Sequence, residues 1–191
     1  MRLFVSVDLP EALSDSIAAI QEELARASGI RPTDPTQTHV TLKFLGEVAA
    51  SRVDTVVEGL TSAVDRAEVA PFEAEVTGLG VFPDLEYITV VWLGFTDGAA
   101  ELTALADAVE TELTARGFDE RDHAFTPHAT IARMDHAGGK AHVQRVVEEH
   151  SPELGRVRVD AIALTESELT PDGPRYTTIE RIPLADDGVA G

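Results

Sequence analysis

Apolar and polar residues alternate along this chain with two periods, which predict strands and helices in a mixed order. Every second residue of 3–8 is apolar, which is typical of a half-buried strand. A helix is predicted to follow from Pro10 to about Ala27, because apolar residues recur there at helical spacing. These apolar residues are Leu13, Ile17, Ile20 and Leu24.

The same two periods predict the remaining elements. Strands are expected at 38–45, 72–81, 87–95, 125–133, 156–167 and 175–182. Helices are expected at 51–66, capped by Ser51, at 99–116, ended by Gly117, and at about 140–150. Loops or turns are expected at 28–37, 82–84, 118–124 and 171–174, with a frayed tail at 185–191. Hairpins interleaved with helices favour an α+β fold with largely antiparallel sheets.

Composition and charge narrow the function classes. With 191 residues, the chain suits one compact domain or two small lobes. The absence of cysteine excludes disulfides, thiolate nucleophiles and cysteine-ligated metals. No segment is apolar enough to span a membrane, and the first ten residues do not resemble a signal peptide, so a cytoplasmic protein is expected.

The chain is strongly acidic, with 34 Asp and Glu against 15 Lys and Arg and a formal net charge of −19. Such a surface cannot grip a long nucleic-acid duplex electrostatically. If the protein handles nucleic acid, it should therefore bind a short terminus in a local positive pocket. A salt-rich cytoplasm is our hypothesis for the origin of the charge, because high ionic strength screens the self-repulsion.

The main chemical signal is a repeated motif, His-x-Thr followed by an aliphatic residue. It occurs at His39, in THVTLK, and 89 residues later at His128, in PHATIA. Residues i and i+2 of a strand share a face, so Thr41 lies beside His39 and Thr130 beside His128. One such tripeptide means little, because a strand histidine is often merely packed. Two on predicted strands indicate an acid–base pair flanking a phosphate, with the two hydroxyls donating hydrogen bonds to its oxygens.

Strand parity suggests which neighbours could join this site. Lys43 follows Thr41 by two residues and is predicted to face the phosphate or to lie at the cleft rim. Phe44 and Phe125 have the opposite parity to the histidines and are expected in the core. Tyr87 is a candidate for stacking on a base. The other histidines, His123, His136, His142 and His150, are expected at the surface.

At these residues the chain resembles the two-histidine phosphoesterase superfamily. Within that superfamily it resembles the bacterial and archaeal RNA 2′,3′-cyclic phosphodiesterases, historically called 2′-5′ RNA ligases. The likeness extends over nearly the whole chain, in the segments RLFVSVDLP, HVTLKFLGEV, GLGVFPD, FTPHATIARM and LTESELTPDGPRYTTIERIPL. Ile131 stands where leucine is common in the family.

The resemblance implies a bilobed fold over residues 1–184, two pseudo-twofold lobes that are each a small antiparallel sheet backed by helices, with the site in the cleft between them. It implies hydrolysis of an RNA 2′,3′-cyclic phosphate to a 2′-phosphate without metal or other cofactor, and a weak reversible 2′-5′ ligation. By analogy, His128 is the base and His39 the acid that protonates the 3′-oxygen. It also implies that Arg133 binds the phosphate. Arg133 has the opposite parity to Thr130 and needs a bulge, strand twist or its own length to reach it.

Several alternatives stay open at this point. Neither histidine has the carboxylate or helical-spacing neighbours of a metal ligand, and no glycine-rich triphosphate loop exists. A binding module for RNA ends or nucleotides is the main rival to an enzyme. The substrate could be a short single-stranded RNA end such as a tRNA half, or a small nucleotide such as ADP-ribose cyclic phosphate or 2′-5′ oligoadenylate. Loops 28–37 and 118–124 are expected to set that choice. A monomer with no membrane partner is expected.

Overall fold

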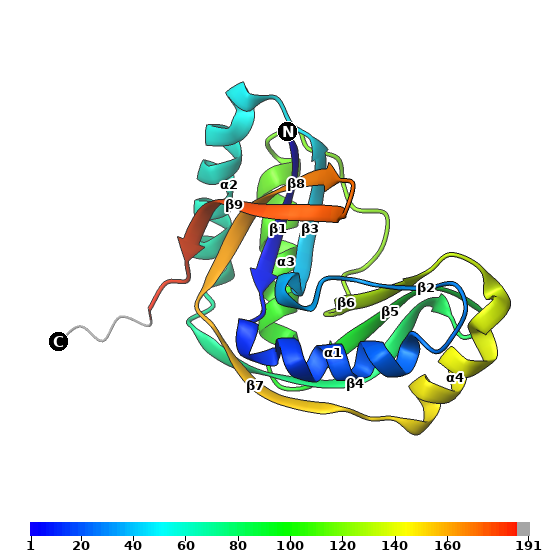
Figure 1. Cartoon of the computed structure of the whole chain (residues 1–191). Coiled ribbons are helices and arrows are strands. Elements are labelled where there is room, and N and C mark those ends of the chain that lie inside the picture. Colours follow the sequence, from blue (N-terminus) through cyan, green and yellow to red (C-terminus); the bar gives the residue numbers. More distant parts are fainter. Residues whose placement is uncertain (187–191) are drawn as a thin grey trace.

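The computed structural model describes residues 1–186 and shows one curled antiparallel sheet backed by four α-helices (Figure 1). The helices and strands in chain order are β1 (Arg2–Asp8), α1 (Ser14–Leu24), β2 (Ile30–Pro32), β3 (His39–Glu47), α2 (Val53–Ala67), β4 (Phe72–Asp84), β5 (Tyr87–Phe95), α3 (Ala99–Thr114), β6 (Ala129–Met134), α4 (Lys140–Glu149), β7 (Glu153–Val159), β8 (Ala161–Thr170) and β9 (Gly173–Pro183). The strand order is β7-β4-β5-β6-β3-β1-β8-β9, and β2 pairs with β6. The expected α+β class with antiparallel pairing is confirmed.

The sheet divides into two lobes at the junction of β3 and β6. Lobe A contains β1, β3, β8 and β9 and is covered by α2 and α3; lobe B contains β2, β4, β5, β6 and β7 and is covered by α1 and α4 (Figure 1). Outward from the junction, the strand that carries the motif is followed in each lobe by the strand that precedes it in that lobe, β1 beside β3 and β5 beside β6. The lobes interleave along the chain, because α1 follows a strand of lobe A yet packs on lobe B.

The helices are held by the apolar faces that the sequence predicts. On α3, the four residues at helical spacing are buried and form part of the core: Leu102, Leu105, Val109 and Leu113. Burying a leucine side chain contributes about 1.5–3 kcal/mol, so this face fixes α3 firmly against α2 and β3. The expected C′ residue Gly117 has φ +86°, a left-handed conformation that glycine adopts without strain.

Two expected strand boundaries were wrong. The single closing strand at 156–167 is two strands, because β7 pairs with β4 in lobe B whereas β8 pairs with β1 in lobe A, and the chain crosses between them at Asp160. The expected turn at 82–84 belongs to β4. The Asp84 carboxylate accepts hydrogen bonds from the backbone N–H groups of Glu86 and Tyr87, which moves the turn two residues onward.

Three smaller expectations also need correction. The expected loop at 28–37 contains the short strand β2 and a 3₁₀ turn at Pro35–Gln37. Ser51 lies inside a 3₁₀ turn before α2 and does not cap that helix. The expected strand at 125–133 begins only at Ala129, so His128 directly precedes it. Of the expected frayed tail, residues 187–191 lie outside the described residues.

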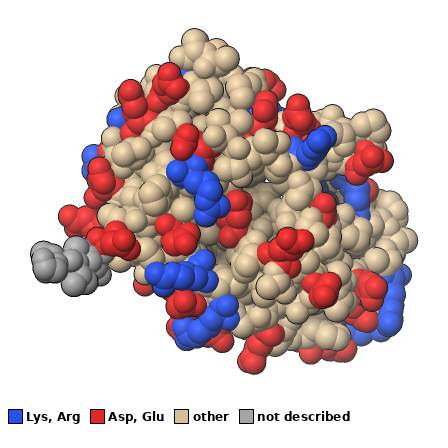
Figure 2. All heavy atoms as spheres, turned by 60° about the vertical axis from the view of Figure 1, so that its left-hand side comes forward, with Lys and Arg blue, Asp and Glu red and all other residues tan. Residues whose placement is uncertain are grey.

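The charged side chains of the chain are mainly acidic, with 34 Asp and Glu against 15 Lys and Arg. On the face drawn in Figure 2, Asp and Glu side chains are spread widely, and Lys and Arg side chains stand among them. None of the helices in residues 1–186 is both long and apolar enough to cross a membrane.

Candidate active site

The two histidine motifs meet where the lobes join. Val40 of β3 pairs with Ala129 of β6, the one pair of residues between these two strands within 1–186. His39 and Thr41 are the two neighbours of Val40, and His128 and Thr130 are the two neighbours of Ala129, so both motifs flank this pair, and the charge of His128 acts on His39. The structure therefore brings the four predicted side chains to one face of the junction.

Both imidazoles are oriented by the same local contact. The Nδ1 atom of His39 lies 2.8 Å from the backbone oxygen of Gln37, and Nδ1 of His128 lies 2.6 Å from that of Thr126. A carbonyl oxygen can only accept, so each Nδ1 carries a proton and donates it. Each neutral ring then has its unprotonated nitrogen at Nε2. This equivalence matches the repeat in the sequence.

Aromatic side chains pack around each imidazole. Phe4 stacks on His39 with 4.9 Å between ring centroids, and Tyr176 packs edge-on against His39 at 5.1 Å. In lobe B, Phe82 packs edge-on against His128 at 4.8 Å. These contacts hold both rings in fixed orientations and shield them from water.

Trp92 lines the lobe B side as well, at 5.9 Å from His128, and its buried indole Nε1 has no hydrogen-bond partner within 1–186. Its ring lies flat on Gly80, where an added Cβ would come within 2.2 Å of the indole carbon Cζ2. Any larger residue at position 80 would displace the ring. The second glycine of the segment GLGVFPD, Gly80, is thereby explained by close packing.

Burial lowers the pKa of both imidazoles from the usual value of 6.5. For His39, the hydrogen bond to the Gln37 carbonyl and the charge of the Asp8 carboxylate oppose this effect and raise the pKa, while the charge of His128 lowers it further. For His128, only the hydrogen bond to the Thr126 carbonyl opposes burial. His39 thus has a carboxylate nearby that raises its pKa, whereas His128 has none.

A bulge follows each motif and reverses the parity of the strand. In β3, Ser6 pairs with Thr41 and Val5 with Lys43, so Leu42 is the extra residue. In β6, Trp92 pairs with Thr130 and Val91 with Ala132, so Ile131 is the extra residue. Beyond a bulge, side chains swap faces relative to plain alternation.

Plain strand alternation would point Arg133 away from Thr130, and the bulge in β6 removes this obstacle. It returns Arg133 to the face of Thr130, where its guanidinium is exposed. The positive charge of Arg133 acts on the Tyr176 hydroxyl, whose pKa is raised by burial and lowered again by Arg133 and Arg2. The charge of an arginine of lobe B thus acts on a tyrosine of lobe A across the junction.

The bulge in β3 overturns two expectations. Lys43 is buried on the core side, where its Nζ lies 2.7 Å from the Glu110 carboxylate and donates to the Asp119 carbonyl at 2.7 Å. Lys43 is therefore neither a phosphate ligand nor a residue of the cleft rim. Phe44, expected in the core, is 73% exposed on the site face. It occupies the position in lobe A that Arg133 occupies in lobe B.

Most of the remaining expectations for aromatic and histidine residues are confirmed, and the one for His142 is wrong. Phe125 packs against the core as expected, and Tyr87 is 67% exposed at the end of the β4–β5 hairpin. Surface positions are confirmed for His123, His136 and His150, whereas His142 is half-buried and bonded through Nε2 to the Glu23 backbone oxygen at 2.8 Å.

Several residues around His39 escaped the sequence-based prediction. Parity could have indicated two of them, because Phe4 and Asp8 lie on the face of β1 opposite its apolar stripe. Tyr176 and Gln37 gave no signal, since they reach the site through contacts that join distant segments. The Gln37 side chain accepts from the Tyr176 backbone N–H at 3.0 Å and donates to the Pro174 oxygen at 3.4 Å.

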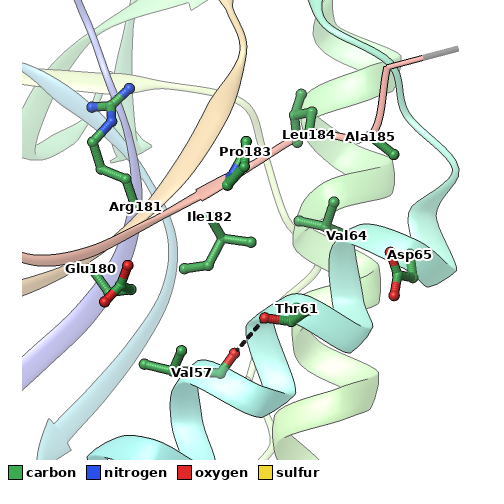
Figure 3. A pocket seen from close by; sticks show the side chains of 10 residues that line it. All are labelled: Val57, Thr61, Val64, Asp65, Glu180, Arg181, Ile182, Pro183, Leu184 and Ala185. Carbon is green, nitrogen blue, oxygen red and sulfur yellow. Dashed lines mark hydrogen bonds between the residues drawn. The ribbon is translucent and has the colours of Figure 1, made fainter. Parts of the chain in front are cut away.

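One surface hollow lies away from this junction. It measures about 340 Å³ and lies between α2 and β9 at the outer edge of lobe A (Figure 3). Apolar side chains such as Val64 and Ile182 line it, together with charged groups such as Asp65. None of the histidine or threonine residues of the two motifs takes part, so the chemistry belongs to the junction.

Comparison with known proteins gives the same picture. A sequence model of the 2′-5′ RNA ligase superfamily matches residues 9–170. The RNA 2′,3′-cyclic phosphodiesterase of Methanothermobacter thermautotrophicus is 34% identical over 183 residues, which cover 94% of this chain and 97% of that protein. The RNA 2′,3′-cyclic phosphodiesterase of Archaeoglobus fulgidus is 35% identical over 177 residues, covering 92% and 96%. The crystal structure of Escherichia coli LigT complexed with 3′-AMP has a TM-score of 0.75 at 26% identity, covering 97% of this chain and 98% of that one.

Proposed function

Because the chain belongs to the 2′-5′ RNA ligase superfamily, we propose that it hydrolyses 2′,3′-cyclic phosphates at RNA ends to 2′-phosphates, with His39 and His128 as the acid–base pair. The observation that carries this proposal is the junction of β3 and β6, where two equally oriented imidazoles share one face. Their free Nε2 atoms are the groups that proton transfer requires. The named activities of the relatives support the same substrate class.

In this mechanism the neutral Nε2 of His128 takes a proton from water, whose oxygen attacks phosphorus. The bond from phosphorus to the 3′-oxygen breaks, and the protonated His39 gives its Nε2 proton to that oxygen, leaving a 2′-phosphate. The Asp8 carboxylate supports this order of roles, because it favours the protonated form of His39 and has no counterpart at His128. Hydrolysis needs no other proton donor.

Thr41, Thr130 and Arg133 are proposed to hold the phosphate. The two hydroxyls can donate to its non-bridging oxygens, and the exposed guanidinium of Arg133 supplies positive charge for the negative charge that grows in the transition state. With a net charge of −19, the rest of the molecule repels polyanions, which fits recognition of a short RNA end.

The remaining assignments belong to this proposal. Residues 1–184 are proposed to act as one bilobed domain, as a monomer in the cytoplasm and without metal. The partners are short single-stranded RNA ends such as tRNA halves, or small cyclic nucleotides. Reversible 2′-5′ ligation follows from the same chemistry, because a ribose 5′-hydroxyl can take the place of water.

The test is hydrolysis of an RNA ending in a 2′,3′-cyclic phosphate, in the presence of chelator. We expect full activity for the unaltered protein, a 2′-phosphate product, and losses of about 10²–10⁴-fold for His39→Ala and for His128→Ala. His150→Ala serves as control, since that exposed residue ends α4 far along lobe B. Undiminished turnover after either substitution at the junction would overturn the proposal. Absent turnover with micromolar product binding would indicate a binding module instead.

A further inference from the structure

A second hollow lies beside His39, on the site face of lobe A. It measures about 190 Å³, which corresponds to about six water molecules of liquid volume and suits one base or sugar. It is enclosed by the ends of β1 and β3, by the turn at Pro35–Gln37 and by β9. The residues that matter here are Phe4, Asp8, Thr36, His39, Tyr176 and Thr178.

The proposed function, on which this inference rests, indicates which part of the substrate lies at this hollow. The leaving 3′-oxygen belongs to the ribose of the terminal nucleotide, and His39 protonates that oxygen. The terminal nucleoside must therefore lie on the His39 side of the phosphate. The hollow is on that side, and the partly exposed ring of Tyr176 lines it, held edge-on against the buried Phe4 with 5.3 Å between ring centroids, so that one aromatic side chain is available to a flat base.

Apart from His39, which acts on the phosphate, the one charged side chain of the lining is a carboxylate, Asp8. Its Oδ1 accepts from the Ser6 hydroxyl at 3.2 Å, and its Oδ2 lies 4.0 Å from an Arg181 nitrogen that is mostly exposed. An ionised carboxylate offers about four acceptor sites, so acceptor capacity remains. An anion here disfavours phosphate, and it must face an uncharged, donor-bearing part of the substrate.

Among the four bases, guanine presents two adjacent donors, N1–H and the N2 amino group. Adenine and cytosine present one amino donor beside an acceptor, and uracil presents one donor between two carbonyl oxygens. A carboxylate pairs with two parallel donors and repels neighbouring acceptors. We infer that the hollow beside His39 binds the terminal base of the RNA, and that Asp8 makes it prefer guanine.

The experiment compares the 2′,3′-cyclic monophosphates of guanosine, adenosine, cytidine and uridine at one pH. We expect kcat/KM to be about tenfold or more higher for the guanosine substrate than for the uridine one. In Asp8→Asn, the amide offers one acceptor and one donor, so the preference should shift from guanine toward adenine, cytosine and uracil. Asp160→Asn is the matched control, because Asp160 also contacts Arg181, at 3.6 Å, but lies outside the lining.

Ratios between substrates separate this role from an effect on His39. Loss of the carboxylate also removes a charge that favours protonated His39, but that changes the rate for all four substrates equally. Equal rates for all four bases, or an unaltered ranking in Asp8→Asn, would overturn the inference. If none of the four is hydrolysed, the assay on RNA ending in a 2′,3′-cyclic phosphate decides on the proposed function. Calorimetric binding of the four nucleoside 2′-monophosphates then decides on the hollow alone by the same ranking.

Discussion

At the scale of single residues, the decisive feature is that burial acts on both imidazoles in the same direction. The hydrogen bonds to the carbonyls of Gln37 and Thr126 only partly offset it. A lower pKa makes His128 a neutral base at lower pH and also removes the proton of His39 at lower pH. Both limbs of the rate profile therefore move in the acidic direction.

We predict a bell-shaped profile of kcat/KM against pH whose centre lies below 6.5, the usual histidine value. The bell for kcat should lie at higher pH, because a bound phosphate anion stabilises the protonated form of both rings. Initial rates from pH 4 to pH 9 would measure both. A kcat/KM that climbs steadily through pH 9 would contradict the pair.

At the scale of elements, Gln37 joins the turn before β3 to the β8–β9 hairpin. Its backbone oxygen orients His39, and its side chain fixes the strand segment that carries Tyr176. Gln37 is therefore a positioning residue, since it acts on the proton donor through its neighbours. Lobe B has a comparable amide contact away from the site, from Gln144 to the Leu85 oxygen at 2.6 Å.

We predict that Gln37→Leu lowers kcat by about ten- to a hundredfold, because small misplacements of a catalytic group are costly. It should also shift the alkaline limb of the pH profile. Both variants should lower the free energy of unfolding by about 1 kcal/mol, but Gln144→Leu should leave the pH profile of the rate unchanged. Equal pH profiles for the two variants would reduce Gln37 to a structural role.

The bulge in β3 gives Lys43 a structural task that its parity did not predict. Lys43 and Glu110 form a buried ion pair, with 4% and 15% of their side chains exposed. The pair and the Asp119 carbonyl fasten the start of the 118–124 loop to α3 and β3. Removing one charge leaves the other buried without its partner.

Lys43→Met should lower the free energy of unfolding by about 3 kcal/mol, with KM unchanged. The double variant Lys43→Met with Glu110→Gln should recover most of that loss, because no unpaired charge remains and the glutamine oxygen can still accept from the Arg121 N–H. Urea unfolding measures the stability. A raised KM at normal stability would instead restore Lys43 as a phosphate ligand.

At the scale of the whole molecule, 15 basic side chains cannot neutralise 34 carboxylates. Many carboxylates therefore repel one another at neutral pH, and this repulsion destabilises the compact state. Screening shortens its range, since the Debye length falls from about 10 Å at 0.1 M salt to about 3 Å at 1 M.

We predict that stability at pH 7 rises from low to molar potassium chloride. Each kcal/mol gained should raise Tm by about 2–4 °C for a chain of this length. Thermal unfolding near the isoelectric point, about pH 4.5, is the control, because the salt effect should nearly vanish where the net charge does. Greatest stability at low salt would contradict both the repulsion and the hypothesis of a salt-rich cytoplasm.

Local spacing was sufficient to determine the class of the fold, and it predicted the residues of the candidate site. The period of two in residues 3–8 and 38–45 predicts strands, the apolar spacing on α3 predicts its buried face, and the two His-x-Thr motifs predict paired side chains on one face. The strand and helix predictions are confirmed because each depends on the geometry of a few consecutive residues.

The tertiary structure alone decided what lies around that centre. Bulges at Leu42 and Ile131 arise from pairing with distant strands, so plain alternation misplaced Lys43 and Phe44 and left Arg133 undecided. The break at Asp160 has the same origin, because the two strands it separates pair in different lobes. Residues that meet only through long-range pairing leave no period in the sequence, and their contacts exist only once the sheet has formed.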